Sequence, residues 1–302
     1  MPDASDAQPS SSKATAFFRR VTTSLVLWTV VIGVLFFENP TVSRGAFIFL
    51  ILFLALAGLI EFYELAEMRG LACFKWSGLL GAVLLTVGTY LNLTGRLGLS
   101  DSPARVNDFE TGFIILFVLG LCVRMFVSKS NHRMSAIAIT LFGLMYVPWL
   151  LNFFQKIYFF PRVDGKYFLL YFVLLTKFSD MGAYAIGSVI GRHKMVPRIS
   201  PHKTWEGFAG SILVATGASL AFVRLFGAHM DGMNAFHAVI LGVVLGGTAV
   251  VGDLVESLFK REAGAKDSGG LFPGIGGILD LLDSLLFNAP IMYLYLRHVL
   301  TD

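Results

Sequence analysis

The sequence contains little charge and almost no cysteine. Only 15% of its 302 residues are charged and 55% are hydrophobic, whereas about a quarter of the residues in a soluble domain carry charge. The two cysteines, Cys73 and Cys122, belong to no CxxC pair, so neither a disulfide framework nor a zinc site is indicated. We interpret both as small buried hydrophobic residues. The low charge content excludes a soluble globular domain and indicates a membrane protein.

Apolar runs of about 20 residues, the length that crosses a bilayer as a helix, recur along the whole chain. They predict an all-α fold, a polytopic transmembrane helical bundle of about nine spans. The spans are expected near residues 21–37, 45–66, 77–94, 110–127, 135–153, 166–188, 206–226, 236–258 and 277–299.

The composition divides the chain into three parts. Residues 1–16 are polar and rich in Ser and Ala, which predicts a disordered tail. The first apolar run ends in FFENP without a small-residue cleavage site, so we expect an uncleaved span rather than a signal peptide. Residues 17–165 are predicted to form an N-terminal transmembrane scaffold of about five spans. Residues 166–302 are predicted to form a C-terminal catalytic region of about four spans.

Lysine and arginine are unevenly distributed between the predicted loops. With the N-terminus inside, the inner loops and tail hold 15 of the 24 Lys and Arg residues and the outer loops hold 8, with Lys177 inside a span. Positive loops face the cytoplasm, so loops 189–205 and 259–276 are expected there. Together with the low cysteine content, this favours an integral protein of a bacterial inner (plasma) membrane whose active site faces the cytoplasm.

The eighth predicted span ends in a polar stripe, because Asp253, Glu256, Ser257 and Lys260 share one helix face. A carboxylate in the hydrocarbon costs about 2.5–3.5 kcal/mol on insertion scales, so this face must meet protein, water or an ion. A helix end that emerges into water with a Glu256–Lys260 pair is the simpler alternative. That alternative leaves Asp253, the deepest of the set, unexplained.

Two further aspartates, Asp280 and Asp283, lie three residues apart at the start of the ninth predicted span. Carboxylates in a first turn are favoured by the helix dipole alone, but a single one would suffice for that. Paired carboxylates repel one another unless a proton or cation lies between them. Oxygen ligands without nearby His or Cys suit Mg²⁺, which binds one or two carboxylates together with substrate phosphates.

The two loops on the predicted cytoplasmic side carry cations and hydrogen-bonding groups. The stretch 261–277, which includes most of loop 259–276, contains six glycines among cations, and although such a loop is often only a flexible linker, glycine backbones also bind phosphate. No GK[ST] follows, so it is not a Walker A motif. Loop 189–205 is basic, as membrane proteins generally are on this side, but it is also stiffened by Pro197 and Pro201. Asp180 lies in another polar stripe, with Lys177 and Tyr184.

Residues 257–283 resemble the signature of the phosphatidate cytidylyltransferases, also called CDP-diacylglycerol synthases. The pattern is S-x-x-K-R-x4-K-D-x-G-x-x-F-P followed by G-G-x-x-D-x-x-D. The stretch SDMGAYAIGSVIGRHKMVPRISPHKTWEGFAGS looks like the second signature region of the same family, and the match covers about residues 176–287. Two positions depart from the usual pattern, with Ile275 in place of a histidine and Leu281 in place of an arginine. We expect both to be dispensable.

The resemblance implies that CTP and phosphatidate react to give CDP-diacylglycerol and pyrophosphate, with Mg²⁺ as cofactor. It also allows a second, monovalent cation. The implied partners are CTP and phosphatidate in the membrane, with no nucleic acid, and a homodimer is left open. The predicted catalytic residues are Lys260, Asp280 and Asp283, and the predicted metal ligands are Asp253, Asp280 and Asp283. Predicted to bind substrate are Arg198, Ser200, Lys203, Thr204, Arg261, Lys266, Asp267 and Asp180.

Three alternatives remain open at this stage. Another CTP-dependent lipid enzyme, such as a polyprenol kinase or an ether-lipid cytidylyltransferase, would share most of the same features. A cation- or proton-coupled transporter would explain the carboxylates within spans but not the clustered cations and glycines, and the chain shows no internal repeat. A purely structural membrane protein would tolerate replacement of the aspartates by asparagine.

Overall fold

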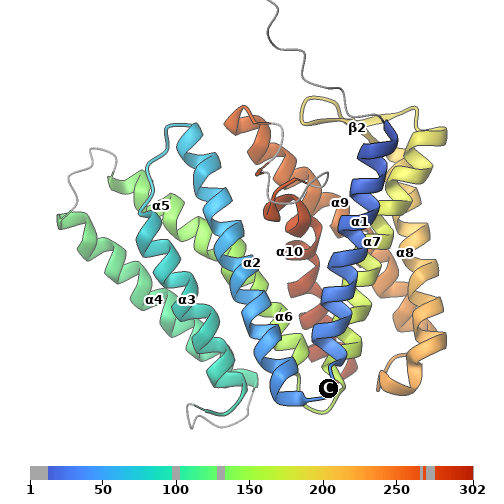
Figure 1. Ribbon diagram of the computed structural model, residues 1–302, viewed down its shortest axis with the longest axis horizontal. Coiled ribbons are helices and arrows are strands. Elements are labelled where there is room, and N and C mark those ends of the chain that lie inside the picture. The colour runs from blue at the N-terminus through green and yellow to red at the C-terminus, as the bar shows by residue number, and fades with distance from the viewer. Residues whose placement is uncertain (1–12, 97–102, 128–132, 266–267, 270–275, 302) are drawn as a thin grey trace, which may run out of the picture.

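The computed structural model describes residues 13–96, 103–127, 133–265, 268–269 and 276–301. Nearly all of them are helical, and the fold is an all-α bundle (Figure 1). The N-terminal half comprises α1 (Lys13–Phe36), α2 (Pro40–Met68), α3 (Lys75–Leu93), α4 (Pro103–Val127), α5 (Arg133–Leu144), the π-helical turn η1 (Met145–Trp149) and α6 (Leu150–Tyr158). The C-terminal half comprises α7 (Gly165–Ile190), β1 (Lys194–Val196), β2 (Ser200–Thr204), α8 (Trp205–Phe226), η2 (Gly227–His229), α9 (Ala235–Ala263), α10 (Ile278–Tyr295) and η3 (Leu296–Leu300).

The predicted polytopic membrane fold is confirmed. Within the described residues, eight helical segments are long and apolar enough to cross a membrane. They coincide with the second to ninth predicted spans. The first predicted span falls on α1, of which Thr22–Phe36 is a shorter apolar helix. Helix α1 begins at Lys13, so residues 13–16 of the predicted disordered tail are helical, and residues 1–12 lie outside the described part.

Helix boundaries follow local capping chemistry. The side chain of Asn39 accepts hydrogen bonds at the start of α2, where Pro40 occupies the first turn, and Asn234 caps α9 in the same way. Such caps satisfy backbone N–H groups that have no partner inside the helix. Helix α9 ends at Gly264, whose φ of 70° is left-handed, a conformation that glycine adopts without steric cost.

The cysteine predictions have different outcomes. Cys73 is partly buried, whereas Cys122 is exposed, so the prediction of burial is wrong for Cys122. Its helix, α4, buries little of its surface in the bundle; a side chain that faces lipid is apolar without being buried in protein. Burial, with the nearby Glu67 carboxylate, raises the pKa of the Cys73 thiol to about 11. Cys73 therefore remains a protonated, unreactive thiol.

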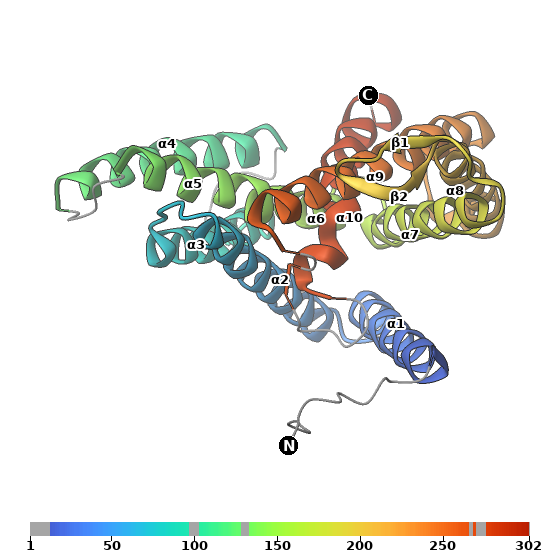
Figure 2. The same ribbon diagram turned by 90° about the horizontal axis from the view of Figure 1, so that it is seen from above.

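Helices α7, α8 and α9 pack side by side, and α10 lies between this group and the N-terminal half (Figures 1 and 2). Helix α10 contacts α9, α6, α2 and α7. Glycines allow the close crossings. A Cβ atom at Gly182 of α7 would lie 2.7 Å from the Gly210 carbonyl of α8, and one at Gly252 of α9 would lie 2.7 Å from the Asp283 carbonyl of α10. The second crossing brings the acidic residues of α9 and α10 together.

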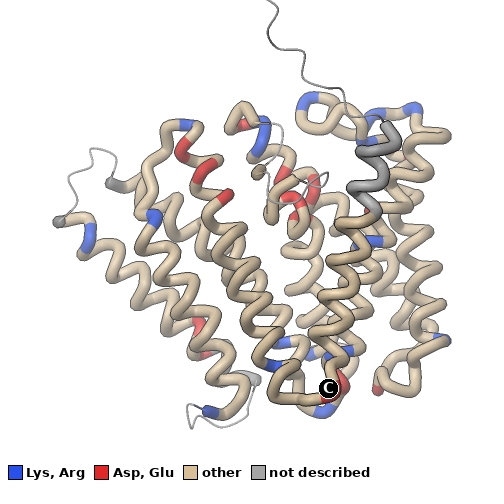
Figure 3. Tube along the Cα trace, in the orientation of Figure 1, with Lys and Arg blue, Asp and Glu red and all other residues tan. Residues whose placement is uncertain are grey.

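The loop between α7 and α8 contains a two-stranded antiparallel hairpin, with Val196 opposite Ser200 and Lys194 opposite Thr204. The sequence predicted a stiff loop here and no strands. The hairpin, the C-terminal end of α9 and the start of α10 lie at the same end of the bundle (Figure 1). Most charged residues lie toward the two ends of the helices, and a group of acidic residues lies on the helices near the hairpin end (Figure 3).

Candidate active site

Three carboxylates converge where α9 crosses α10. Asp253 and Glu256 come from consecutive turns of α9 and Asp283 comes from the first two turns of α10, and one oxygen of each lies within 4.8 Å of the others. The glycine at position 252 permits this approach, because any side chain there would collide with the α10 backbone. Asp253 is partly exposed and the other two are buried. Three like charges at this separation require neutralisation.

Lys260 supplies part of that neutralisation. Its Nζ lies 2.5 Å from Glu256 and 2.6 Å from Asp280. Glu256 is 0% exposed, and within the described part of the chain neither of its oxygens has a hydrogen bond of acceptable geometry. Its only described charge partner is thus the Lys260 ammonium group. The Glu256–Lys260 pair of the simpler alternative is present, but it does not emerge into water, because Glu256 is fully buried and the Lys260 side chain is mostly buried.

Asp280 is held by the turn that begins α10. Its Oδ2 accepts hydrogen bonds from the Gly277 N–H at 2.8 Å, the Ser268 N–H at 3.1 Å and the Ser268 hydroxyl at 2.8 Å. Its Oδ1 faces Lys260. The sequence grouped Asp280 with Asp253 and Asp283 as metal ligands. The structure instead groups those two with Glu256, and it directs Asp280 to the helix cap and to Lys260.

Asp180 of α7 is linked to Asp283 through Ser284. Ser284 donates its hydroxyl to Asp180 at 3.3 Å and its backbone N–H to Asp283 at 2.5 Å. Lys177, one turn before Asp180, is 3.4 Å from that carboxylate and donates to the Leu281 carbonyl at 3.1 Å. Lys177 and Asp180 of α7 thus contact the start of α10. Asp180 therefore lies near the acidic cluster, as its predicted role requires.

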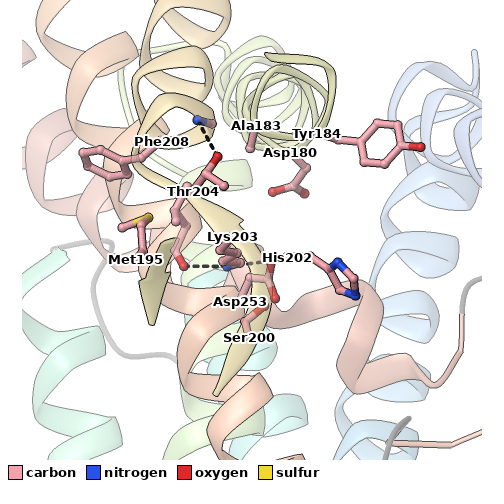
Figure 4. Close-up of a pocket in the computed structure, with 12 residues that line it drawn as sticks. Asp180, Ala183, Tyr184, Met195, Ser200, His202, Lys203, Thr204, Phe208 and Asp253 are labelled. Carbon is pink, nitrogen blue, oxygen red and sulfur yellow. Dashed lines mark hydrogen bonds and ion pairs between the residues drawn. The ribbon is translucent and has the colours of Figure 1, made fainter. Parts of the chain in front are cut away.

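The hairpin covers a cavity of about 240 Å³ beside the acidic cluster (Figure 4). Lys203 lies between β2 and α9, 2.8 Å from Asp253, and it also donates to the Val250 carbonyl at 3.0 Å. The side chains of Asp180 and Asp253 both line this cavity. The hairpin, α7 and α9 therefore share one cavity at the hairpin end of the bundle.

The other residues that were predicted to bind substrate lie at different positions relative to this cavity. Ser200 lines the cavity. Thr204 lines it as well, but its hydroxyl accepts the Gly207 N–H at 3.1 Å and caps α8. Arg198 is exposed in the hairpin turn and is not one of the described cavity residues. The Nε of Arg261 donates to the Ile199 carbonyl at 3.2 Å and so connects α9 to the hairpin. Lys266, Asp267 and Ile275 lie outside the described residues.

Sequence reasoning missed Glu61, a buried residue of α2. Its two oxygens accept the backbone N–H groups of Ile278 at 2.9 Å and Leu279 at 2.8 Å, and the Ser268 hydroxyl lies 3.2 Å away. A carboxylate at a helix N-terminus satisfies free N–H groups and complements the helix dipole. The available signal was a carboxylate in the apolar run GLIEFY. The structure shows that it holds the end of α10 that carries Asp280 and Asp283.

The cluster fits a hard divalent cation. Its donors are all carboxylate oxygens, one of its members is buried with no hydrogen-bond donor of acceptable geometry among the described residues, and a cavity that Lys203 lines adjoins it. Mg²⁺ prefers oxygen ligands and shares them with substrate phosphates. The fold and site define a polytopic helical membrane protein with an acidic site that lysines surround, a combination suited to polyanionic substrates at a membrane surface.

Comparison with known proteins identifies the family. The model of the cytidylyltransferase family matches residues 18–299. A phosphatidate cytidylyltransferase of Staphylococcus epidermidis is 33% identical over 275 residues, which cover 89% of this chain and 96% of that protein. A second, from Staphylococcus haemolyticus, is 32% identical over 268 residues with the same coverage. The Escherichia coli protein YnbB, whose function is uncharacterised, is 36% identical over 174 residues, or 55% of each chain. The chain belongs to the cytidylyltransferase family, which confirms the predicted resemblance and the predicted enzyme class, a nucleotidyltransferase.

Proposed function

We propose that this protein transfers the cytidylyl group of CTP to phosphatidate and forms CDP-diacylglycerol and pyrophosphate. The observation that carries the proposal is the acidic cluster of Asp253, Glu256 and Asp283, flanked by Lys203 and Lys260 and adjoined by the cavity under the hairpin. Both substrates are polyanions, so they can meet only where positive charge offsets theirs. Family membership supplies the reaction class.

The reaction needs positioning and charge neutralisation more than covalent chemistry. A phosphate oxygen of phosphatidate attacks the α-phosphorus of CTP, a new P–O bond forms, and the bond to the β-phosphate oxygen breaks with its electron pair leaving on pyrophosphate. Lys203, which faces the cavity, would receive phosphate oxygens. Lys260 would offset charge on the α-phosphate, and Asp280 with Ser268 would fix its ammonium group through the contact at 2.6 Å.

We infer that Asp253, Glu256 and Asp283 would hold Mg²⁺. Asp280 was also predicted to be a ligand from the sequence, and that role stays a prediction. The ion would supply charge neutralisation for the triphosphate. The protein is an integral membrane protein, and we propose that it lies in a bacterial plasma membrane with the hairpin end toward the cytoplasm, where CTP is found. The excess of Lys and Arg in loops on that side supports this orientation.

The function is tested with purified protein in vesicles that contain phosphatidate. We expect pyrophosphate release that requires CTP, Mg²⁺ and phosphatidate together, with CDP-diacylglycerol as the lipid product. Polyprenol and an ether-linked phosphatidate analogue are offered in parallel, since preferential turnover of either would assign the protein to a neighbouring activity. Ion flux without CTP, combined with no turnover of any lipid, would contradict the enzyme reading and favour a transporter.

Lys203→Met should lower kcat/KM for CTP about tenfold, the equivalent of about 1.4 kcal/mol, because a charge-assisted contact to phosphate is worth about that much. Methionine keeps most of the side-chain length and removes the charge. The matched control is Lys194→Met, an exposed lysine on the other strand of the hairpin. Steady-state kinetics with varied CTP measure the effect, and equal values for both variants would remove Lys203 from phosphate binding.

A further inference from the structure

An apolar groove of about 340 Å³ lies on the other side of the Lys177–Asp180 pair from the hairpin cavity. Helices α1, α2, α6, α7 and α10 line it, and α1 lies at the edge of the bundle beside α2 and α7 (Figure 2). Among the residues that line it, the two with polar side chains are Ser24 and Lys177, apart from the amphipathic Trp28. Its remaining walls are aliphatic or phenylalanine side chains.

The groove has a polar end and an apolar end. On α7 it runs from Leu169 to Lys177, roughly 12 Å at about 1.5 Å of rise per residue. Helix α1 runs in the opposite direction, so Ser24 lies toward the same end as Lys177 and Leu35 lies toward the end of Leu169 (Figure 1). The polar end is the one nearer the hairpin and the acidic cluster. Such a polarity matches an amphiphile with an anionic head and an apolar tail.

Lys177 joins the groove to the candidate active site. Its side chain lines the groove, while its ammonium group contacts Asp180, which lines the hairpin cavity, at 3.4 Å. It also donates to the carbonyl of Leu281 at 3.1 Å, two residues before Asp283. A cation within a membrane span is costly unless it has a partner or a function. The 3.4 Å contact is long for a charge-assisted hydrogen bond, so Asp180 binds it loosely.

We propose that this groove holds an acyl chain of the phosphatidate substrate and that Lys177 receives its phosphate from the membrane side. This inference rests on the proposed function and adds to it the route by which the lipid meets the nucleotide. The lipid enters beside α1, its phosphate is held by Lys177, and CTP approaches the same carboxylates through the hairpin cavity. The two substrates thus reach Asp283 from opposite sides of the Lys177–Asp180 pair.

The first test blocks the groove without touching the acidic cluster. Val173→Trp on α7 and Val31→Trp on the opposite wall, α1, should each raise KM for dioleoyl phosphatidate about tenfold. This is roughly the binding free energy lost when about two methylene groups of the acyl chain are no longer buried. KM for water-soluble dihexanoyl phosphatidate and for CTP should stay unchanged. Leu25→Trp is the matched control, since Leu25 lies on α1 but is 62% exposed. Equal losses with short and long chains in both blocked variants would overturn the proposal.

The second test needs no turnover and uses Trp28, which lines the groove. Two sets of phosphatidylcholine vesicles are compared. One contains a small fraction of brominated phosphatidate and the other an equal fraction of brominated phosphatidylcholine, and the brominated acyl chains quench tryptophan fluorescence at contact. We expect phosphatidate to quench at severalfold lower mole fraction, a preference that should disappear in Lys177→Gln and in Trp28→Phe. Equal quenching by both lipids in the unaltered protein would show a general lipid contact and overturn the proposal. If quenching is selective but no nucleotide transfer occurs, the groove stands and the proposed function fails.

Discussion

Asp283→Asn is expected to reduce turnover at least ~10²-fold, about 2.7 kcal/mol of transition-state stabilisation, and to raise the Mg²⁺ concentration needed for half-maximal rate. Asp283 is a member of the three-carboxylate group and comes from a different helix than the other two. An amide at this position removes one anionic oxygen and leaves the side-chain volume unchanged. The loss should therefore fall on cation binding and catalysis more than on folding.

The control is Asp231→Asn, an exposed aspartate in the turn between α8 and α9, which should behave as the unaltered protein. Binding of Mn²⁺, followed by the loss of its free-ion electron spin resonance signal, gives a readout that does not depend on turnover. Asp283→Asn should bind Mn²⁺ at least tenfold more weakly, about 1.4 kcal/mol. Unchanged turnover and Mn²⁺ affinity would remove Asp283 from the metal site.

The sequence predicted the helices well because hydropathy is a local property. A bilayer requires about 20 apolar residues in a row, and Gly165–Ile190 and Ala235–Ala263 extend the predicted spans by only a few residues. The hairpin was not predicted, because three- and five-residue strands in a loop of Lys, Pro and His show no alternation of apolar and polar residues. Its pairing depends instead on where α7 ends and α8 begins.

The composition of the acidic group could be predicted only in part. Residues three apart share a face of a helix, so Asp253 and Glu256 belong together on any reading. Asp280 and Asp283 also lie three residues apart and both contact α9, Asp280 at Lys260 and Asp283 at the other two carboxylates. Which of the two joins the carboxylates depends on the rotation of α10 about its axis. That rotation follows from contacts distant in sequence. The backbone at Asp283 packs on Gly252, and the first turn of α10 is bound by Glu61. No local pattern could reveal either contact.

These long-range contacts also explain how the N-terminal half takes part in the chemistry. The sequence assigned residues 17–165 a scaffold role. Glu61 shows how one residue of this part supports the site. Its carboxylate fixes the cap of α10, the cap fixes Asp280 through Ser268 and Gly277, and Asp280 in turn fixes Lys260. A change in α2 should therefore alter the acidic cluster and its lysine without contact with either substrate.

Glu61→Gln tests this chain of contacts. Glutamine has one acceptor oxygen in place of two, so one of the buried N–H groups of Ile278 and Leu279 would face an amide N–H, at a cost of about 1–3 kcal/mol. We expect kcat to fall at least tenfold and the half-saturating Mg²⁺ concentration to rise, because Asp283 shifts together with the first turn of α10. KM for CTP should change less, since Lys203 belongs to the hairpin.

The matched control is Glu64→Gln on the same helix, whose side chain is 52% exposed and pairs with Lys75. It should leave kcat and the Mg²⁺ requirement unchanged, because exposed ion pairs contribute little. Thermal unfolding in detergent separates the two ways in which Glu61 could act. If Glu61→Gln lowers Tm but the folded enzyme keeps its kcat and Mg²⁺ dependence, then Glu61 only stabilises the fold. If both kinetic quantities change in protein that remains folded at the assay temperature, α2 positions the acidic residues for the reaction.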